Sequence, residues 1–378
     1  MILPAIIGAL MIVIVLWDAF ETIVLPRRVA RWFRLTRIFY LSTWIPWRAI
    51  GRRIRRAKTR ESFLSYFGPL SLLVLFVIWA GALIFAFGIL YYAAAQRHDP
   101  TLSHFSTSLY MSGTTFFTLG LGDVTPHTRA ERILAILESG LGFGFLALVV
   151  SYLPVIYQAF SRREVNIVLL DARAGSPPTA AEIFRRHTGP QGREALRALL
   201  HDWERWSAQI LESHISYPVV SYFRSQHSNE SWLAALAAIL DVSSLLIANA
   251  DDACARQARL TFAMSRHTVV DLAQVFYRRP LESAPDRFPP ADLQRLKATL
   301  KESGYEIRET EASEKKLTKL REMYEPFLQA LAAYLQVDLP PWILSKEITD
   351  NWKTSAWGRI SGFAASREQE VTVDDHSD

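Results

Sequence analysis

The sequence is poor in cysteine and has regions without one or both kinds of charge. Cys254 is the single cysteine among 378 residues, which excludes an intrachain disulfide, argues against a cysteine-based metal site and fits a reducing compartment. Residues 27–60 contain twelve Lys and Arg but no acidic residue, and residues 62–95 contain no charged residue. No GxGxxG motif follows a strand-like segment and no Walker motif is present, so the common nucleotide-binding sites are not expected.

Hydrophobic residues make up 50% of the chain and are concentrated in its first part. Three segments, 2–25, 62–95 and 133–161, supply the about 20 apolar helical residues that a bilayer core requires. A signal peptide is the alternative for the first segment, but no basic region precedes it, which favours an uncleaved membrane helix. The composition therefore predicts a membrane protein with a soluble C-terminal part.

The basic stretch over residues 27–60 mixes arginine with tryptophan, tyrosine and phenylalanine. This mixture is typical of an amphipathic segment on a membrane surface and predicts binding of anionic lipids. Nucleic acid is the rival partner, but the position of the stretch between two membrane helices argues against it. The positive-inside rule places the stretch in the cytoplasm, the N-terminus and loop 96–131 outside, and the chain after about residue 161 in the cytoplasm.

Helical spacing continues after the third span. Apolar residues recur at intervals of three and four from Leu196 to Ile210 and from Leu317 to Tyr334, which predicts amphipathic helices. These helices form either a helical bundle or an intersubunit coiled coil. Residues 231–248 are apolar around Asp241, and we interpret them as the buried central helix of a soluble domain, with a fourth membrane span as the alternative.

A short segment, residues 103–117, lies between the second and third spans and is followed by the run TLGLGD at residues 118–123. The segment is too short and too polar to span a bilayer. Non-helical backbone at membrane depth is tolerated only where protein or water surrounds it. The pattern therefore predicts a re-entrant loop, made of a short helix and an extended stretch.

The residue types of this run suit the binding of a dehydrated cation. Backbone carbonyls of residues 118–121 can replace the water of the ion in stacked rings, and the Thr118 hydroxyl adds the innermost ring. Gly120 and Gly122 permit the alternating backbone handedness that points consecutive carbonyls one way. Asp123 follows the last ring and would concentrate cations at the outer mouth. The predicted ion-binding residues are Thr118, Leu119, Gly120, Leu121 and Gly122.

The sequence TTFFTLGLGD at residues 114–123 resembles the signature of potassium channels, whose usual filter reads TVGYGD. The resemblance covers residues 62–161 and implies an outer helix, a pore helix, a selectivity filter and an inner helix. It implies K+ as the permeant ion, with no organic cofactor and no enzymatic activity. Because four carbonyls form each ring and each chain has one pore loop, a homotetramer is expected. Leu121 replaces the usual aromatic residue, so a nonselective cation channel is the nearest alternative.

The third span resembles an inner helix that moves during gating. Its glycines predict a hinge, with close packing through small residues as the alternative, and its proline predicts a bend near the inner end. The residues of this hinge and bend are Gly140, Gly142, Gly144 and Pro154. Below the bend, Tyr157 and Phe160 are candidates for a hydrophobic constriction, and Glu138 is expected to pair behind the pore helix.

The C-terminal region contains one cluster of aromatic, imidazole and arginine side chains, close to Pro218. Two interpretations apply: a sensor for an unidentified regulatory ligand or for pH, and packing at a corner between helices. The cluster consists of His214, Tyr217, Tyr222, Arg224 and His227.

The sequence thus predicts an all-α membrane protein of the bacterial inner (plasma) membrane, which conducts potassium and is gated through its inner helix by a cytoplasmic helical domain. A membrane-anchored sensor or enzyme is a further alternative, but no catalytic constellation supports it. The predicted parts are an N-terminal transmembrane helix over 1–26, a basic interfacial segment over 27–61, a pore domain over 62–161, a linker over 162–178, a cytoplasmic helical domain over 179–355 and a flexible acidic tail over 356–378.

Overall fold

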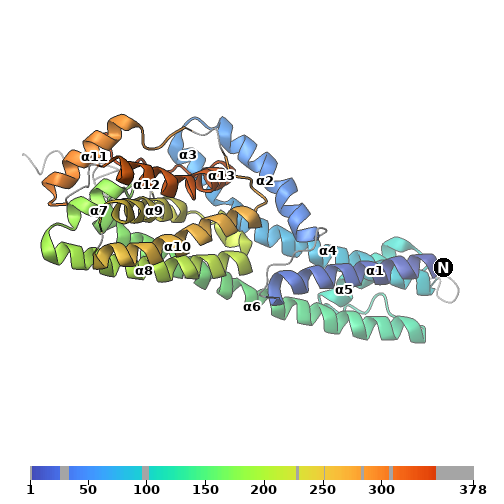
Figure 1. Ribbon diagram of the computed structural model, residues 1–378. Coiled ribbons are helices and arrows are strands. Elements are labelled where there is room, and N and C mark those ends of the chain that lie inside the picture. The colour runs from blue at the N-terminus through green and yellow to red at the C-terminus, as the bar shows by residue number, and fades with distance from the viewer. Residues whose placement is uncertain are drawn as a thin grey trace, which may run out of the picture. The chain divides into compact units, whose positions relative to one another are not determined.

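The computed structural model describes residues 2–25, 34–95, 102–226, 230–250, 252–281, 285–305 and 310–345. Within these ranges the chain forms helices and no strand, which confirms the all-α prediction (Figure 1). The chain divides into two compact units. Unit 1 comprises Met1–Phe160 and Ser213–Arg224, and unit 2 comprises Ser161–Glu212 and Ser225–Asp378. The predicted tail over 356–378 lies outside the described residues.

Four helical segments of the described chain are long and apolar enough to cross a membrane, judged by length and composition. Their bounds are Ile2–Val24, Ala57–Ala95, Arg129–Ala174 and Trp232–Asn249. The most apolar windows of the first three are only 22%, 44% and 17% buried, whereas that of the fourth is 94% buried. An apolar helix needs lipid or protein around it, so the first three have surface available for the bilayer or for other copies, and the fourth is covered within its own unit.

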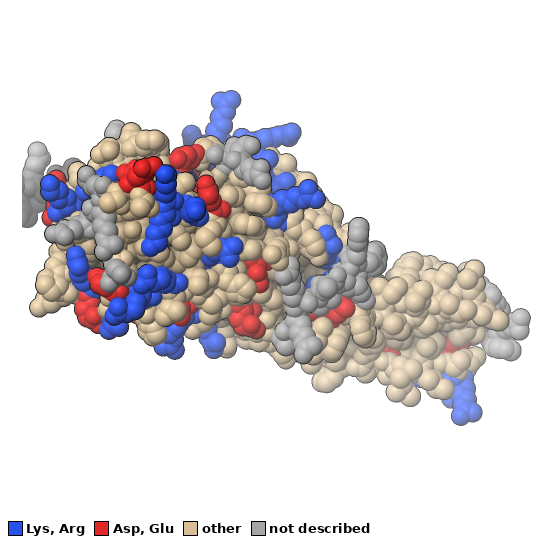
Figure 2. Space-filling view, in the orientation of Figure 1, with Lys and Arg blue, Asp and Glu red and all other residues tan. Residues whose placement is uncertain are grey.

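Unit 1 is built around two long apolar helices. Helix α1 (Ile2–Ala19) continues into the π-helix η1 (Phe20–Val24) and packs along α4 (Phe67–Ala95). A Cβ atom at Gly8 would lie 2.8 Å from the carbonyl oxygen of Ala86, so the two helices approach closely because this position has no side chain. In Figure 2 the surface over α1 and α4 is almost free of charge, which suits a hydrocarbon environment.

The basic stretch forms two helices, α2 (Leu35–Arg53) and α3 (Ala57–Ser65), which precede α4. Figure 2 shows Lys and Arg side chains gathered over them. A buried carboxylate attaches α2 to the apolar helices. Asp18, 1% exposed, accepts hydrogen bonds from the Thr36 hydroxyl at 2.6 Å, from the Thr36 amide at 3.1 Å and from the Trp79 indole at 3.1 Å. Asp18 thus provides a hydrogen-bond acceptor for the Thr36 amide. This amide lies in the first turn of α2, where backbone N–H groups have no partner within the helix.

The pore-loop helix α5 (Phe105–Phe116) packs against α4 and leads through a loop to α6 (Arg129–Ala174). The loop ends in a capping box, in which Glu131 accepts from the amides of His127 and Thr128, both at 2.9 Å, and the Thr128 hydroxyl accepts from the Glu131 amide at 3.3 Å. This reciprocal pairing starts α6 at a defined residue.

Helix α6 is longer than the sequence analysis predicted. It has 46 residues and continues past the end of the apolar stretch as far as Ala174. Most of the predicted linker over 162–178 is therefore helical and belongs to α6. The charged run at residues 162–164 indicated an exit from the membrane, but such a run does not end a helix, since arginine and glutamate are good helix formers.

Unit 2 is a helical bundle around α9 (Trp232–Asn249). Almost all of α9 is buried, and α7, α10, α12 and α13 pack against it. The elements that the chain forms after α6 are α7 (Ala180–Arg186), α8 (Gly189–Ser216), the 3-10 helix η2 (Pro218–Tyr222), α9, α10 (Ala253–Val275), α11 (Pro290–Glu302), α12 (Glu311–Glu322) and α13 (Glu325–Leu335). The last turn of α8 and all of η2 belong to unit 1, so the predicted single domain over 179–355 is interrupted.

The one acidic residue of α9 is satisfied inside the bundle. Arg287 donates to both oxygens of Asp241, at 2.9 and 3.2 Å, and to both oxygens of Glu325, at 2.5 and 2.9 Å. The Tyr324 hydroxyl donates to Asp241 at 2.7 Å. Burial raises the pKa of Asp241 to about 6 although the charge of Arg287 opposes this. Burial also acts to raise the pKa of Glu325, but the hydrogen bonds and charge of Arg287 hold it below its usual value.

Candidate functional site

The pore helix α5 ends at the first residues of TLGLGD. Amide groups of residues 117–119 donate to carbonyls of residues 113–115 at 2.8 to 3.1 Å and close the last turn. After this turn the pattern changes. Among the described residues, none donates a hydrogen bond to a carbonyl of residues 118–122. Backbone carbonyls seek a partner, so these oxygens are available to water or to cations.

The backbone of this stretch alternates in handedness. Thr118, Gly120 and Gly122 have φ angles of 54°, 59° and 78°, in the left-handed region. Glycine adopts this conformation at little cost, and it is rare for a β-branched residue such as threonine. Strained backbone of this kind is concentrated at functional sites. The side chains of Leu119 and Leu121 between them are 60% and 62% exposed, so the chain by itself does not cover the stretch.

The last residue of the run is held by α5. The Tyr110 hydroxyl of α5 donates to Asp123 Oδ2 at 2.8 Å, and both side chains are exposed. This contact joins the middle of α5 to the last residue of the run. Tyr110 was not predicted as a site residue, because no local sequence pattern pairs position 110 with position 123.

Behind the pore helix, three helices meet at a buried polar contact. The Ser112 hydroxyl of α5 lies 2.5 Å from Glu138 Oε1 of α6 and 2.7 Å from the carbonyl oxygen of Ile84 of α4. Ser112 and Glu138 are both fully buried. Glu138 thus pairs behind the pore helix, as expected from its sequence position.

The three glycines of α6 differ in their surroundings. A Cβ atom at Gly142 would lie 2.1 Å from the Phe116 carbonyl oxygen, at the end of the pore helix. A Cβ atom at Gly140 or Gly144 would meet nothing within 4 Å. For Gly142 the structure therefore supports the close-packing alternative, since a side chain there would collide with the backbone of Phe116, two residues before the TLGLGD run.

We expect Gly142→Ala to displace α5 and to destabilise unit 1. The added methyl group would overlap a backbone oxygen, and overpacking of this kind typically costs about 1–3 kcal/mol. The matched controls are Gly140→Ala and Gly144→Ala on the same helix, which add the same methyl group into open space. The measurement is the yield and melting temperature of the detergent-solubilised protein. Equal behaviour of all three variants would contradict the packing role of Gly142.

The candidates for a constriction have different environments. Tyr157 is 67% exposed. The Phe160 ring packs against the Phe223 ring at 5.6 Å between centroids. Phe160 is therefore engaged within unit 1, and Tyr157 is the exposed aromatic residue at this level of α6. The helix continues through Pro154 without interruption.

The segment Ser213–Arg224 attaches to unit 1 through aromatic rings. The Tyr222 ring stacks on Tyr40 of α2 at 5.7 Å and 5°, and lies 5.0 Å from the Trp44 ring and 5.1 Å from the Phe67 ring, edge to face. These pairs have the separations and orientations that aromatic rings prefer. Tyr222 is 4% exposed, so it fixes this segment to α2 and to the start of α4.

The same segment contacts the inner helix. Tyr217 packs against Tyr152 of α6 at 5.7 Å between ring centroids, two residues before Pro154. Phe223 lies over Gly68, where a Cβ atom would be 2.7 Å from the ring, and it also contacts Phe160 as described above. The segment therefore touches α6 on both sides of Pro154.

The predicted regulatory cluster is only partly assembled. Tyr217 and Tyr222 belong to the contacts above, and Arg224 lies 3.4 Å from Glu61. His214 is fully buried, with Nδ1 3.0 Å from the Ser213 hydroxyl. His227 lies outside the described residues. The described members support the packing interpretation, because their partners are side chains of unit 1.

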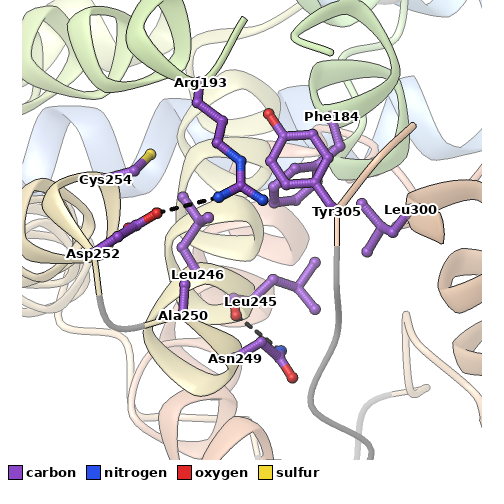
Figure 3. Close-up of a pocket in the computed structure, with 10 residues that line it drawn as sticks. All are labelled: Phe184, Arg193, Leu245, Leu246, Asn249, Ala250, Asp252, Cys254, Leu300 and Tyr305. Carbon is purple, nitrogen blue, oxygen red and sulfur yellow. Dashed lines mark hydrogen bonds and ion pairs between the residues drawn. The ribbon is translucent and has the colours of Figure 1, made fainter. Parts of the chain in front are cut away.

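Unit 2 contains a small cavity between α7, α8, α9, α10 and α11 (Figure 3). Arg193 lies 3.7 Å from Asp252 and 5.4 Å from the Tyr305 ring centroid, and the wall beneath is mainly apolar. Cys254 is buried here, and burial raises the pKa of its thiol to about 11. The cavity holds about 40 Å³, which is room for a few water molecules and far below the size of a nucleotide site.

Comparison with known proteins places this geometry in an ion channel domain. Residues 72–158 match the model of a family described as "Ion channel". This range contains the pore helix, the TLGLGD run and most of the apolar part of α6. The molecule is thus an all-α membrane protein with an ion channel domain.

A curated relative agrees with the membrane assignment. The chain is 24% identical over 268 residues to a Bacillus subtilis (strain 168) protein named "Uncharacterized membrane protein YdjJ", an alignment that covers 68% of this chain and 74% of the relative. No solved structure matches this chain.

Proposed function

We propose that the chain is the subunit of a homotetrameric cation channel that prefers or selects potassium, with residues 118–122 as its selectivity filter. The observation that carries the proposal is the alternation of left-handed residues at Thr118, Gly120 and Gly122 beside carbonyls without hydrogen-bond partners, inside an ion channel domain. Four such stretches around an axis would replace the hydration shell of K+ by stacked carbonyl rings. Because one chain supplies one quarter of each ring, the site is complete only in the tetramer.

The orientation follows from charge. The basic helices α2 and α3 lie in the cytoplasm against anionic lipid headgroups, and α1 brings the N-terminus outside. Helix α4 then runs outward and α6 returns, so that Asp123 faces the outer solution and unit 2 lies in the cytoplasm of a bacterial cell. The antiparallel packing of α1 on α4, in which Gly8 meets Ala86 and Asp18 meets Trp79, supports this path.

A nonselective cation channel is the second candidate, and one residue favours it. Leu121 stands where potassium channels usually have an aromatic residue, and its apolar side chain cannot donate a hydrogen bond to hold the filter at a fixed width. Potassium would then be preferred weakly over sodium. The two candidates share the pore and differ in the rigidity of its filter.

Ion flux from liposomes tests the proposal. Protein reconstituted into vesicles loaded with K+ is expected to release K+ when the membrane potential is set by an ionophore, and to do so far faster than protein-free vesicles. A bi-ionic reversal potential then separates the candidates: a value near zero for Na+ against K+ indicates a nonselective pore. Absence of flux would instead favour a membrane-anchored sensor.

We further propose that unit 2 acts on the pore through the segment Ser213–Arg224, which we call the coupling segment. At both of its ends the chain passes into unit 2, and its own side chains hold α2, α4 and α6. A force on α8 would thus reach the inner helix next to Pro154. The proposal requires no ligand in unit 1.

We expect Tyr222→Ala to change gating but not permeation. The substitution removes the ring that contacts Tyr40, Trp44 and Phe67 and leaves the filter untouched. In planar bilayers the open probability should shift several-fold, while unitary conductance and ion selectivity stay at wild-type values. Tyr277→Ala, which removes a tyrosine of unit 2 that is 57% exposed, is the control and should behave as wild type. An unchanged open probability in Tyr222→Ala would remove the coupling segment from the gating mechanism.

A further inference from the structure

The last three turns of α6 expose an apolar stripe. Val165, Val168 and Leu169 are 55%, 48% and 54% exposed, and Ala172 is also exposed. All four belong to unit 2, and the spacing 165–168–172 is the three-four spacing of coiled-coil core positions. Branched side chains of this size are rarely left so open along one face of a helix that is otherwise packed.

The opposite face of the same turns is occupied. Ile167 and Leu170 are each 2% exposed. The Arg163 guanidinium is buried and pairs with Glu164 at 2.9 Å, and the Trp206 indole of α8 donates to the Arg163 carbonyl at 3.4 Å. The stripe is therefore the free side of a helix whose other side is built into its own unit.

Lipid is a poor cover for this stripe. The apolar stretch of α6 ends before the charged run at residues 162–164, and Asp171 lies one turn after Ile167 on the same turns as the stripe. Charged side chains are costly at membrane depth, so these turns lie beyond the hydrocarbon region. A protein surface is then the natural cover.

We infer that this stripe packs against the same stripe of other copies, forming a helical bundle that extends the pore beyond the membrane. The inference rests on the proposed homotetramer. Helix α6 runs without a break from Arg129 to Ala174. In a fourfold assembly, four copies of the stripe would therefore extend from the inner end of the pore. The residues at the two core positions are β-branched valines and an alanine, which permit close approach of the helices. Cations leaving the pore would pass along or between these helices.

Disulfide trapping tests the bundle in the full-length protein. In a Cys254→Ala background, Val165→Cys and Val168→Cys are each oxidised in liposomes with copper phenanthroline. The matched control is Ala208→Cys, an exposed alanine on α8 of the same unit. We expect covalent dimers between subunits at positions 165 and 168 in at least about tenfold excess over position 208, because a disulfide requires Cβ atoms within about 3.5–4.5 Å.

A second variant tests stability without new cysteines. Val165→Glu combined with Val168→Glu places eight carboxylates in the proposed bundle and should make the tetramer dissociate at a lower temperature on native gels, whereas Ala208→Glu should not. Three outcomes overturn the inference: a tetramer with no cross-linking at 165 or 168, labelling of these cysteines by a membrane-confined reagent, or their full labelling by a water-soluble maleimide.

Potassium flux tests the pore separately from the bundle. Potassium flux that persists in a protein without cross-links at the stripe would leave the channel in place and remove only the bundle. Absence of both flux and a tetramer would remove the two together.

Discussion

Gly120→Asp is expected to abolish potassium flux. Gly120 has a φ of 59°, and a residue with a Cβ atom pays about 1–2 kcal/mol for this left-handed conformation. With four copies around the axis the conducting conformation loses roughly 4–8 kcal/mol, which reduces its population by about a thousandfold or more. The carboxylates would add mutual repulsion in a narrow passage. The measurement is K+ release from proteoliposomes at equal protein content.

A helix glycine of the same unit supplies the control for this experiment. Gly81 lies on α4, where a Cβ atom would meet nothing within 4 Å, so Gly81→Ala should retain wild-type flux. Both variants should elute with the wild type in size-exclusion chromatography, because residue 120 is exposed in the chain and does not hold unit 1 together. Unchanged flux in a correctly assembled Gly120→Asp protein would refute the filter assignment.

Arg287→Ala is expected to destabilise unit 2 by about 3–5 kcal/mol, the usual effect of removing one partner of a buried ion pair. The guanidinium pairs with two carboxylates at once, and its loss leaves Asp241 buried without its cation and removes the cation that is hydrogen-bonded to Glu325. Asp241, in the middle of the otherwise apolar α9, then destabilises the bundle.

The single cysteine reports this effect inside the full-length protein. Cys254 is 5% exposed, and burial raises the pKa of its thiol to about 11, so it reacts slowly with a maleimide until unit 2 opens. We expect the labelling rate of Arg287→Ala to exceed that of the wild type by more than about a hundredfold in mild urea, since the open population follows the free energy of opening. Lys315→Ala, which removes a cation from a highly exposed ion pair, should label at the wild-type rate.

Replacing all three charged residues of this network separates the electrostatic contribution of Arg287 to stability from its packing contribution. Arg287→Met combined with Asp241→Asn and Glu325→Gln removes all three charges together and should recover a large part of the lost stability, because no unpaired charge remains. A triple variant that labels as fast as Arg287→Ala would show that the contribution of Arg287 is packing alone.

The helical character of the chain, and the short helix followed by a stretch with alternate glycines, could be predicted because they depend on local patterns. The alternate glycines at 120 and 122, the short polar segment before them and the apolar span on either side all lie within residues 62–161. Glu138 could be placed behind the pore helix by the same reasoning. The end of α6 could not be predicted, because a charged run at a membrane boundary looks alike whether the helix ends or continues.

Contacts between residues that are distant in the chain could not be predicted from the sequence. Tyr222 is far from Tyr40 along the chain, and no periodicity indicates that their rings stack. The aromatic cluster around Pro218 therefore allowed both a sensor and packing at a corner between helices, and its partners in unit 1 support packing. Gly142 presented the same ambiguity, since a hinge and a close contact both require a small residue.

The sequence and the tertiary structure account for different features of the run TLGLGD. By itself the sequence determined that Gly120 and Gly122 can turn left-handed and where the apolar spans lie, because these properties belong to single residues and to their spacing. The left-handed conformation of Thr118 is seen only in the structure. The tertiary structure decided what holds the loop: Tyr110 on Asp123, Ser112 on Glu138, and Phe116 against Gly142. These contacts join different helices, and their geometry exists only after the chain has folded.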